Sequence, residues 1–97
     1  MREKAIVTMI RKRLAEIPDS YVLTLHQGGY GRRGVPDILW VYCGRAVFIE
    51  AKTQTGRLTK LQEAEIRRIR TSKAVCEIVR GKEELENLIG MVTHGRH

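Results

Sequence analysis

Asp37, Glu50 and Lys52 have side chains that can hold a cation and move a proton, and they lie in two apolar segments, VPDILWVYC and RAVFIEAK. In a β-strand, residues two apart share a face, so Glu50 and Lys52 point the same way. A tight turn at Cys43-Gly44 would pair the segments as a hairpin and set Asp37 opposite Glu50, whereas a slip by one residue would separate the carboxylates. Two facing carboxylates on an apolar sheet repel each other and need a compensating cation.

A divalent metal ion would compensate these carboxylates better than Lys52 alone, because it leaves the ammonium free. Oxygen ligands favour Mg²⁺ or Mn²⁺ over Zn²⁺. Such an ion lowers the pKa of a bound water and neutralises charge on a phosphate, which are the requirements of phosphodiester hydrolysis. Lys52 would orient or help to deprotonate the attacking water and stabilise the phosphate. The alternative is that Glu50 and Lys52 are ordinary surface residues of an edge strand.

The elements that must position these residues follow from hydrophobic periodicity and turn signals. Apolar residues at helical spacing predict helices over residues 2–17, over 59–72 and after Gly81. Runs rich in β-branched and aromatic residues predict strands over residues 20–26, 36–43, 45–51 and 74–79. The order is therefore αβββαβα. We expect an α/β/α sandwich, in which the helices cover a single mixed sheet that contains an antiparallel hairpin.

Length and charge limit the class of protein and its partners. The 97 residues suffice for one small domain over residues 1–97, and burial in a homodimer would supplement its core. The net charge of +7 favours a polyanionic partner such as nucleic acid. With no apolar run long enough to span a membrane and no signal-peptide pattern, we expect a cytoplasmic protein without a membrane partner. Cys43 and Cys76 lack the paired spacing of a zinc site and are expected to be buried thiols.

The segment Gly34-Val35-Pro36-Asp37, followed by Glu50-Ala51-Lys52, resembles the PD-(D/E)xK nuclease signature, in particular that of the VRR-NUC domain, the virus-type replication-repair nuclease. The resemblance covers nearly the whole chain. It implies a restriction-endonuclease-like fold and cleavage of DNA that depends on Mg²⁺ or Mn²⁺. For stand-alone viral-type members it also implies a homodimer that acts on branched DNA such as a Holliday junction, in which case the host cytoplasm is the expected location.

The resemblance also implies which residues form the active site. The catalytic set is Asp37, Glu50, Lys52, Glu3 and Gln62. Asp37, Glu50 and the backbone carbonyl of Ala51 would hold the metal, and Glu3 would serve a second metal site.

Glu3 and Gln62 each have a second interpretation from the residues alone. Glu3 lies in the row of apolar residues on the first predicted helix, so its carboxylate follows the buried stripe, but an acid in a first turn also complements the helix dipole. Thr59-Lys60-Leu61-Gln62 is a capping-box sequence, with Thr59 as the N-cap residue. The cap and active-site roles of Gln62 are both open.

The glycine-rich segment Gly29-Tyr30-Gly31-Arg32-Arg33-Gly34 matches the G-x-G-x-x-G dinucleotide fingerprint. That fingerprint requires the glycines to open a helix, whereas a β-rich segment follows here, so we expect no nucleotide cofactor. The segment suits either a loop that contacts DNA or an ordinary solvated turn. The residues predicted to contact DNA are Tyr30, Arg32, Arg33, Arg57 and Lys60.

Two other functions compete with a DNA endonuclease. A non-catalytic DNA-binding module would keep the basic surface without a productive metal, and its binding would be sensitive to salt but independent of metal. A nuclease acting on RNA is the second, because no residue pattern visibly reads or rejects a 2′-hydroxyl.

Overall fold

One mixed sheet of four strands organises the chain in a computed structural model that describes residues 1–26 and 32–95. The strands lie in the order β1-β2-β3-β4 and comprise β1 (Ser20–Thr24), β2 (Ile38–Tyr42), β3 (Arg45–Ala51) and β4 (Val75–Val79). The helices are α1 (Glu3–Ala15), α2 (Lys60–Thr71) and α3 (Lys82–Thr93). The predicted order αβββαβα is confirmed.

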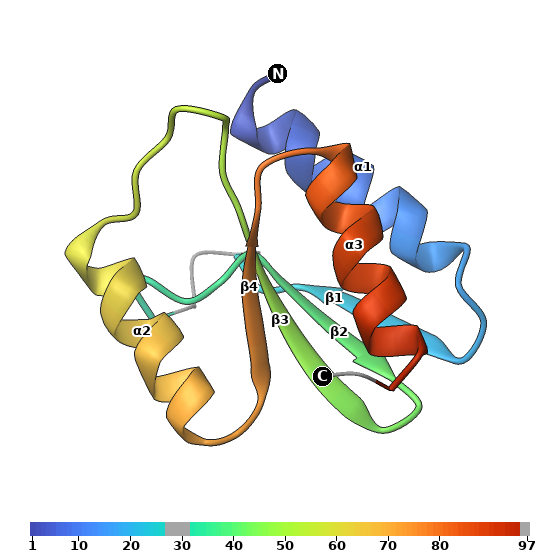
Figure 1. The fold of residues 1–97 in the computed structure, drawn as a ribbon. Coiled ribbons are helices and arrows are strands. Elements are labelled where there is room, and N and C mark those ends of the chain that lie inside the picture. Colours follow the sequence, from blue (N-terminus) through green and yellow to red (C-terminus); the bar gives the residue numbers. More distant parts are fainter. Residues whose placement is uncertain (27–31, 96–97) are drawn as a thin grey trace.

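The helices form two layers around the sheet. α1 and α3 cover one face and α2 covers the other (Figure 1). β2 pairs antiparallel with both β1 and β3, whereas β4 pairs parallel to β3 through the α2 crossover. This is the expected α/β/α sandwich with a mixed, restriction-endonuclease-like sheet.

The hairpin has the predicted register. Cys43 and Gly44 form its turn with φ angles of 49° and 79°, so Tyr42 pairs with Arg45 and Ile38 pairs with Ile49. Asp37 precedes β2 by one residue and therefore lies opposite Glu50.

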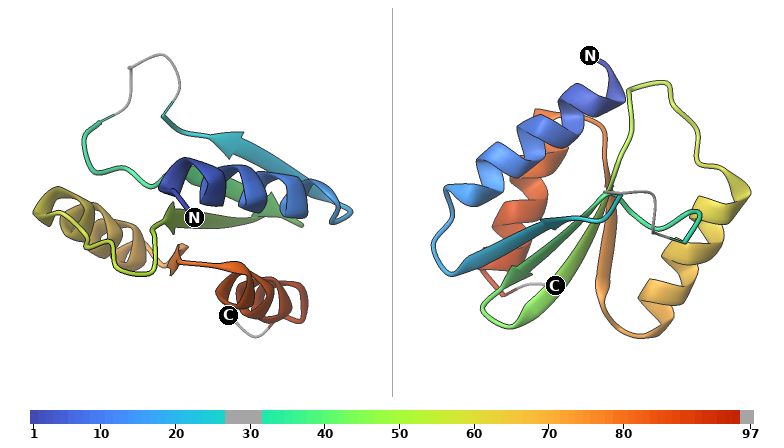
Figure 2. Two further views of the ribbon diagram at one scale, coloured as in Figure 1. Left: turned by 90° about the horizontal axis from the view of Figure 1, so that it is seen from above. Right: turned by 180° about the vertical axis from the view of Figure 1, so that it is seen from behind.

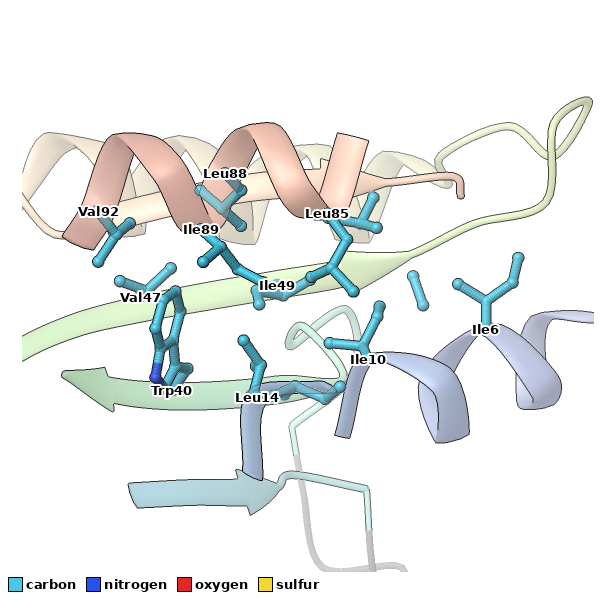
Figure 3. Close-up of a cluster of buried hydrophobic side chains, with 13 residues drawn as sticks. Ile6, Ile10, Leu14, Trp40, Val47, Ile49, Leu85, Leu88, Ile89 and Val92 are labelled. Carbon is cyan, nitrogen blue, oxygen red and sulfur yellow. The ribbon is translucent and has the colours of Figure 1, made fainter. Parts of the chain in front are cut away.

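The main hydrophobic core lies between the sheet and the layer of α1 and α3 (Figure 3). α1 contributes Ile6, Ile10 and Leu14, which recur every four residues and are fully or almost fully buried. From the sheet, Trp40 is fully buried, and its indole N–H donates a hydrogen bond to Ser20 Oγ at 2.9 Å. α3 closes the core with Leu85, Leu88, Ile89 and Val92. This packing fixes α1 against β2 and β3, so its first turn reaches the end of the sheet where β3 terminates.

Most predicted elements extend slightly beyond the observed ones. α1 ends at Ala15, and its last turn tightens because the N–H of Ile17 bonds to Leu14 O before Pro18. β2 starts at Ile38 because Pro36 cannot donate to a ladder. The expectation that Cys43 is buried is wrong, since its place in the hairpin turn exposes it, whereas Cys76 is buried in β4. Within the described residues, no helix is long and apolar enough to cross a membrane.

Candidate active site

Three carboxylates meet at the end of the sheet where β3 terminates. Glu50 comes from β3, Asp37 from the segment before β2 and Glu3 from the first residue of α1. One carboxylate oxygen of each lies within 4.8 Å of the others. The chain leaves β3 beside the first turn of α1, as the rear view in Figure 2 shows, which explains how a residue so early in the chain reaches this end of the sheet.

Asp37 is held in place by both neighbouring strands. Its Oδ2 accepts a hydrogen bond from the backbone N–H of Ala51 at 2.8 Å, and its backbone carbonyl accepts one from Leu25 at 2.8 Å. The carboxylate thus occupies the ladder position that a backbone carbonyl would otherwise take. Because one oxygen is used by the sheet, the other can face the remaining acidic side chains.

Glu50 is the buried member of the carboxylate cluster, with 1% of its surface exposed. Burial and the neighbouring charge of Asp37 raise the pKa of Glu50 from 4.5 to about 8, with a smaller contribution in the same direction from Glu3, while Lys52 acts in the opposite direction. Its Oε1 has no hydrogen-bond partner among the described residues. When Glu50 is ionised, this buried oxygen therefore carries charge without a hydrogen bond from the described residues, which is costly.

Lys52 follows β3 directly and is 6% exposed. Its backbone N–H donates to Val79 O at 3.1 Å, so β4 fixes the start of the side chain. The ammonium lies 4.0 Å from Glu3 Oε2. A buried ammonium beside the carboxylate cluster is therefore part of the same site.

Gln62 forms the predicted cap of α2 and also contacts the carboxylate cluster. Its side-chain Oε1 accepts a hydrogen bond from the backbone N–H of Thr59 at 2.9 Å, and its backbone N–H donates one to Thr59 Oγ1 at 3.1 Å. The two bonds complete the capping box of α2. Its Nε2 also donates to Glu50 Oε2 at 3.2 Å. One amide side chain therefore starts the helix and orients the buried carboxylate.

His26 lies next to the site, although the sequence analysis assigned it no role. Its Nε2 lies 3.5 Å from Asp37 Oδ1, and its side chain is partly exposed. No spacing or motif could have found it, because its position depends on β1 lying beside β2.

The residues predicted to contact DNA differ in whether their charge is already paired within the protein. Arg33, Arg57 and Lys60 are exposed. Arg32 instead forms an ion pair with Glu65 on α2, with Nη2 at 2.8 and 2.6 Å from its two oxygens. Tyr30 lies outside the described residues.

Comparison with known proteins relates this geometry to a fold. No family model matches the sequence, and no curated protein matches it. A solved structure described as a VRR_NUC domain is similar over 91% of this chain and 94% of that one, with a TM-score of 0.78 and 24% sequence identity. The chain has the fold of a VRR-NUC domain. The structural likeness thus agrees with the resemblance seen in the sequence motif.

Within this VRR-NUC fold, the donor set fits a divalent cation. Three carboxylates offer oxygen ligands, which is the chemistry that Mg²⁺ and Mn²⁺ prefer. Glu50 Oε1 has no hydrogen-bond partner in the ranges that the structure describes, and burial together with the charge of Asp37 raises the pKa of Glu50, so a bound cation would stabilise the ionised carboxylate. Asp37 and Glu50 are in place to hold such an ion, and Glu3 lies close enough to take part.

Proposed function

We propose that this chain is a metal-dependent endonuclease that hydrolyses phosphodiester bonds in DNA. The observation that carries the proposal is the meeting of three carboxylates and the buried ammonium of Lys52 at one end of the sheet. The VRR-NUC fold supports the proposal, and three of the clustered residues, Asp37, Glu50 and Lys52, belong to the nuclease-like motif.

The proposed division of labour assigns the metal to Asp37, Glu50 and the backbone carbonyl of Ala51, with Glu3 as a ligand of a second site. When bound, Mg²⁺ or Mn²⁺ would supply positive charge to the phosphate and make a coordinated water more acidic. Lys52 would orient the attacking water and stabilise the negative charge that develops on the phosphate. Its burial supports this role, because an electrostatic interaction is stronger where water is excluded.

Gln62 would keep Glu50 in the ionised, metal-holding orientation by donating to Oε2. This bond leaves Oε1, which has no hydrogen-bond partner in the described part of the chain, for the cation. We therefore treat Gln62 as a positioning residue, whose loss should weaken metal binding without removing a ligand.

DNA is the proposed substrate, in its branched or four-way-junction form, and the proposed active species is a homodimer. The support from charge is the net +7 of the chain and the exposed Arg33, Arg57 and Lys60. The preference for branched DNA and the dimer rest on the motif resemblance.

The first experiment measures cleavage of a four-way junction, a flap and linear duplex DNA in Mg²⁺, in Mn²⁺ and in EDTA. We expect cutting with either metal and none in EDTA. Asp37→Asn, Glu50→Gln and Lys52→Ala should each lower the cleavage rate by about 100-fold or more, since each removes charge or a proton-handling group at the site. Lys52→Met, which keeps the aliphatic packing, should be as inactive as Lys52→Ala.

Glu16→Gln and Lys12→Ala are the matched controls, because both residues are exposed and lie away from the cluster, Lys12 in the last turn of α1 and Glu16 directly after it. They should cleave at the wild-type rate, and circular dichroism should show that every variant folds. Salt-sensitive DNA binding without metal-dependent cutting would overturn the proposal in favour of a non-catalytic binding module. Cutting of RNA in preference to DNA would overturn the assignment of the substrate.

A further inference from the structure

The connection between β3 and α2 has no regular structure. It joins Lys52, directly after β3, to the first turn of α2, which carries Gln62. Residues 53–59 form neither helix nor strand. Within this segment, the N–H of Gly56 bonds to Thr53 O at 3.2 Å and closes a turn. The position of this turn sets the surroundings of Lys52.

Arg80, the residue after β4, binds this turn through a single nitrogen. Its Nη1 donates to Thr53 O at 2.7 Å and to Gly56 O at 2.6 Å. Hydrogen bonds from a charged donor are among the stronger ones in proteins. Since Thr53 O and Gly56 O lie at the two ends of the turn, one guanidinium group fixes both ends.

The backbone of Arg80 is itself held at both of its polar groups. The N–H of Arg80 donates to the carboxylate of Glu84 on α3, and its carbonyl accepts from Gln54 Nε2 at 3.2 Å. In addition, the neighbouring Val79 O accepts from the N–H of Lys52. The end of β4 and the β3–α2 connection are therefore tied together by four hydrogen bonds, two of them from the Arg80 side chain.

The turn held by Arg80 lies against the catalytic candidate. A Cβ placed on Gly56 would lie 3.5 Å from Lys52 Cδ and 2.9 Å from Thr53 Oγ1, so the turn lies directly beside the stem of the lysine. Lys52 is 6% exposed, as expected for a side chain with a neighbour at this distance. A lysine side chain has four rotatable bonds, so its ammonium stays in one place only if neighbouring segments restrict the side chain.

We propose that Arg80 is a positioning residue of the active site, which holds the turn over residues 53–56 so that Lys52 stays directed at the carboxylate cluster. The inference rests on the proposed nuclease function for its consequence in catalysis. The mechanical part, that Arg80 holds the turn, does not depend on that function.

The experiment compares Arg80→Gln and Arg80→Lys with wild type and with Arg13→Gln. Arg13 is the control, because its guanidinium also makes several side-chain hydrogen bonds, two to Glu86 on α3 and one to Glu16. The mechanical readout is brief native digestion with trypsin, followed by mass spectrometry for cleavage after Arg57, just beyond the turn. Arg80→Gln should raise this cleavage by about tenfold, the effect of losing roughly one charge-assisted hydrogen bond, whereas Arg13→Gln should not.

The catalytic readout is the separation of kcat from KM with the best DNA substrate. Arg80→Gln should lower kcat by about tenfold or more and leave KM within about twofold, because a misplaced lysine affects the reacting groups rather than DNA affinity. Arg80→Lys should lie between wild type and Arg80→Gln, since one ammonium nitrogen can replace Nη1 in part.

The two hypotheses fail in different ways. If wild type does not cleave, the nuclease proposal fails while the trypsin result still tests the turn. An unchanged rate of cleavage after Arg57 in Arg80→Gln, or an equal rise in Arg13→Gln, would overturn the positioning role. A raised KM with unchanged kcat would overturn it as well and would identify Arg80 as a DNA contact.

Discussion

At the scale of single residues, the main feature is one buried carboxylate that is short of positive charge. Glu50 receives a hydrogen bond from Gln62 on one oxygen and none from the described residues on the other. Asp37 adds a second negative charge, and Lys52 compensates it only in part. In the absence of a cation, burial and the charge of Asp37 both favour a proton on Glu50, and they raise its pKa.

This raised pKa predicts how the stability of the metal-free protein depends on pH. The pKa of Glu50 is about 8 in the folded protein and 4.5 without the folded environment, so the folded state binds this proton more tightly than the unfolded state. The contribution is fully present below about pH 4.5 and is lost as the pH rises through about 8. In EDTA, the free energy of unfolding should therefore fall between pH 5 and pH 8, by on the order of a few kcal/mol.

Urea denaturation at several pH values in EDTA measures this effect, with Glu50→Gln as the comparison. Glutamine cannot ionise, so the variant should show a flatter profile and should be more stable than wild type at pH 8. Mg²⁺ should stabilise wild type at pH 8 and have little effect on the variant. An equally steep decline in Glu50→Gln would show that another group is responsible.

At the scale of elements, the segment before β2 is fastened to the first two turns of α2. Gly34 has a φ of +86°, and a Cβ there would lie 2.5 Å from Leu61 O. Arg32 reaches Glu65 one turn further along the helix. The two contacts relate the segment that carries Asp37 to the helix that carries Gln62, so the distance between Asp37 and the residue that orients Glu50 depends on this junction.

Gly34→Ala and Gly44→Ala form a matched pair that isolates the close approach. Both glycines have positive φ, +86° and +79°, but a Cβ on Gly44 would meet nothing within 4 Å. Gly44→Ala should cost about 1 kcal/mol from the backbone conformation. Gly34→Ala should cost about 1–3 kcal/mol more, because backbone atoms of α2 must move.

Thermal and urea denaturation give these differences, and cleavage assays below the melting temperature give the functional consequence. Gly34→Ala should also slow cleavage, since it shifts Asp37 relative to Gln62, whereas Gly44→Ala should not. Equal destabilisation by the two substitutions would mean that the contact with α2 contributes nothing beyond the backbone conformation.

At the scale of the whole molecule, charge and size determine how the proposed nuclease would engage DNA. A net charge of +7 on 97 residues attracts DNA without reading its sequence. Resolving a four-way junction requires cuts in two of its four strands. A two-fold symmetric dimer is the simplest species that could place one active site on each of these strands. The edge strand β1 exposes Tyr21 and Leu23, at 63% and 41%, on the sheet face opposite the main core.

The proposed homodimer predicts a mass in solution of twice the chain mass of 11.1 kDa. Light scattering over a concentration series measures it, with and without junction DNA. If the apolar residues of β1 take part, Tyr21→Lys combined with Leu23→Lys should shift the protein to monomer and reduce paired cutting of the junction. A monomer at every concentration, with paired cutting intact, would contradict the dimer.

Much of the architecture could be predicted from the sequence because it depends on local patterns. Helical spacing placed Ile6, Ile10 and Leu14 on one buried stripe, and a tight turn at Cys43-Gly44 set the register of the hairpin. Alternate residues of a strand share a face, so this register was enough to predict that Asp37 and Glu50 lie opposite each other. The capping box at Thr59 and Gln62 was predictable for the same reason, since both residues lie within one helical turn.

Only the tertiary structure could decide which distant segments meet. His26 approaches Asp37 because β1 lies beside β2. Arg32 forms an ion pair with Glu65 because α2 packs next to the segment before β2. Arg80 reaches the turn after Lys52 because β4 runs parallel to β3. These contacts join residues that are 11, 33 and 27 positions apart in sequence, respectively. Local periodicity carries no information about such pairings, because they depend on how whole elements pack.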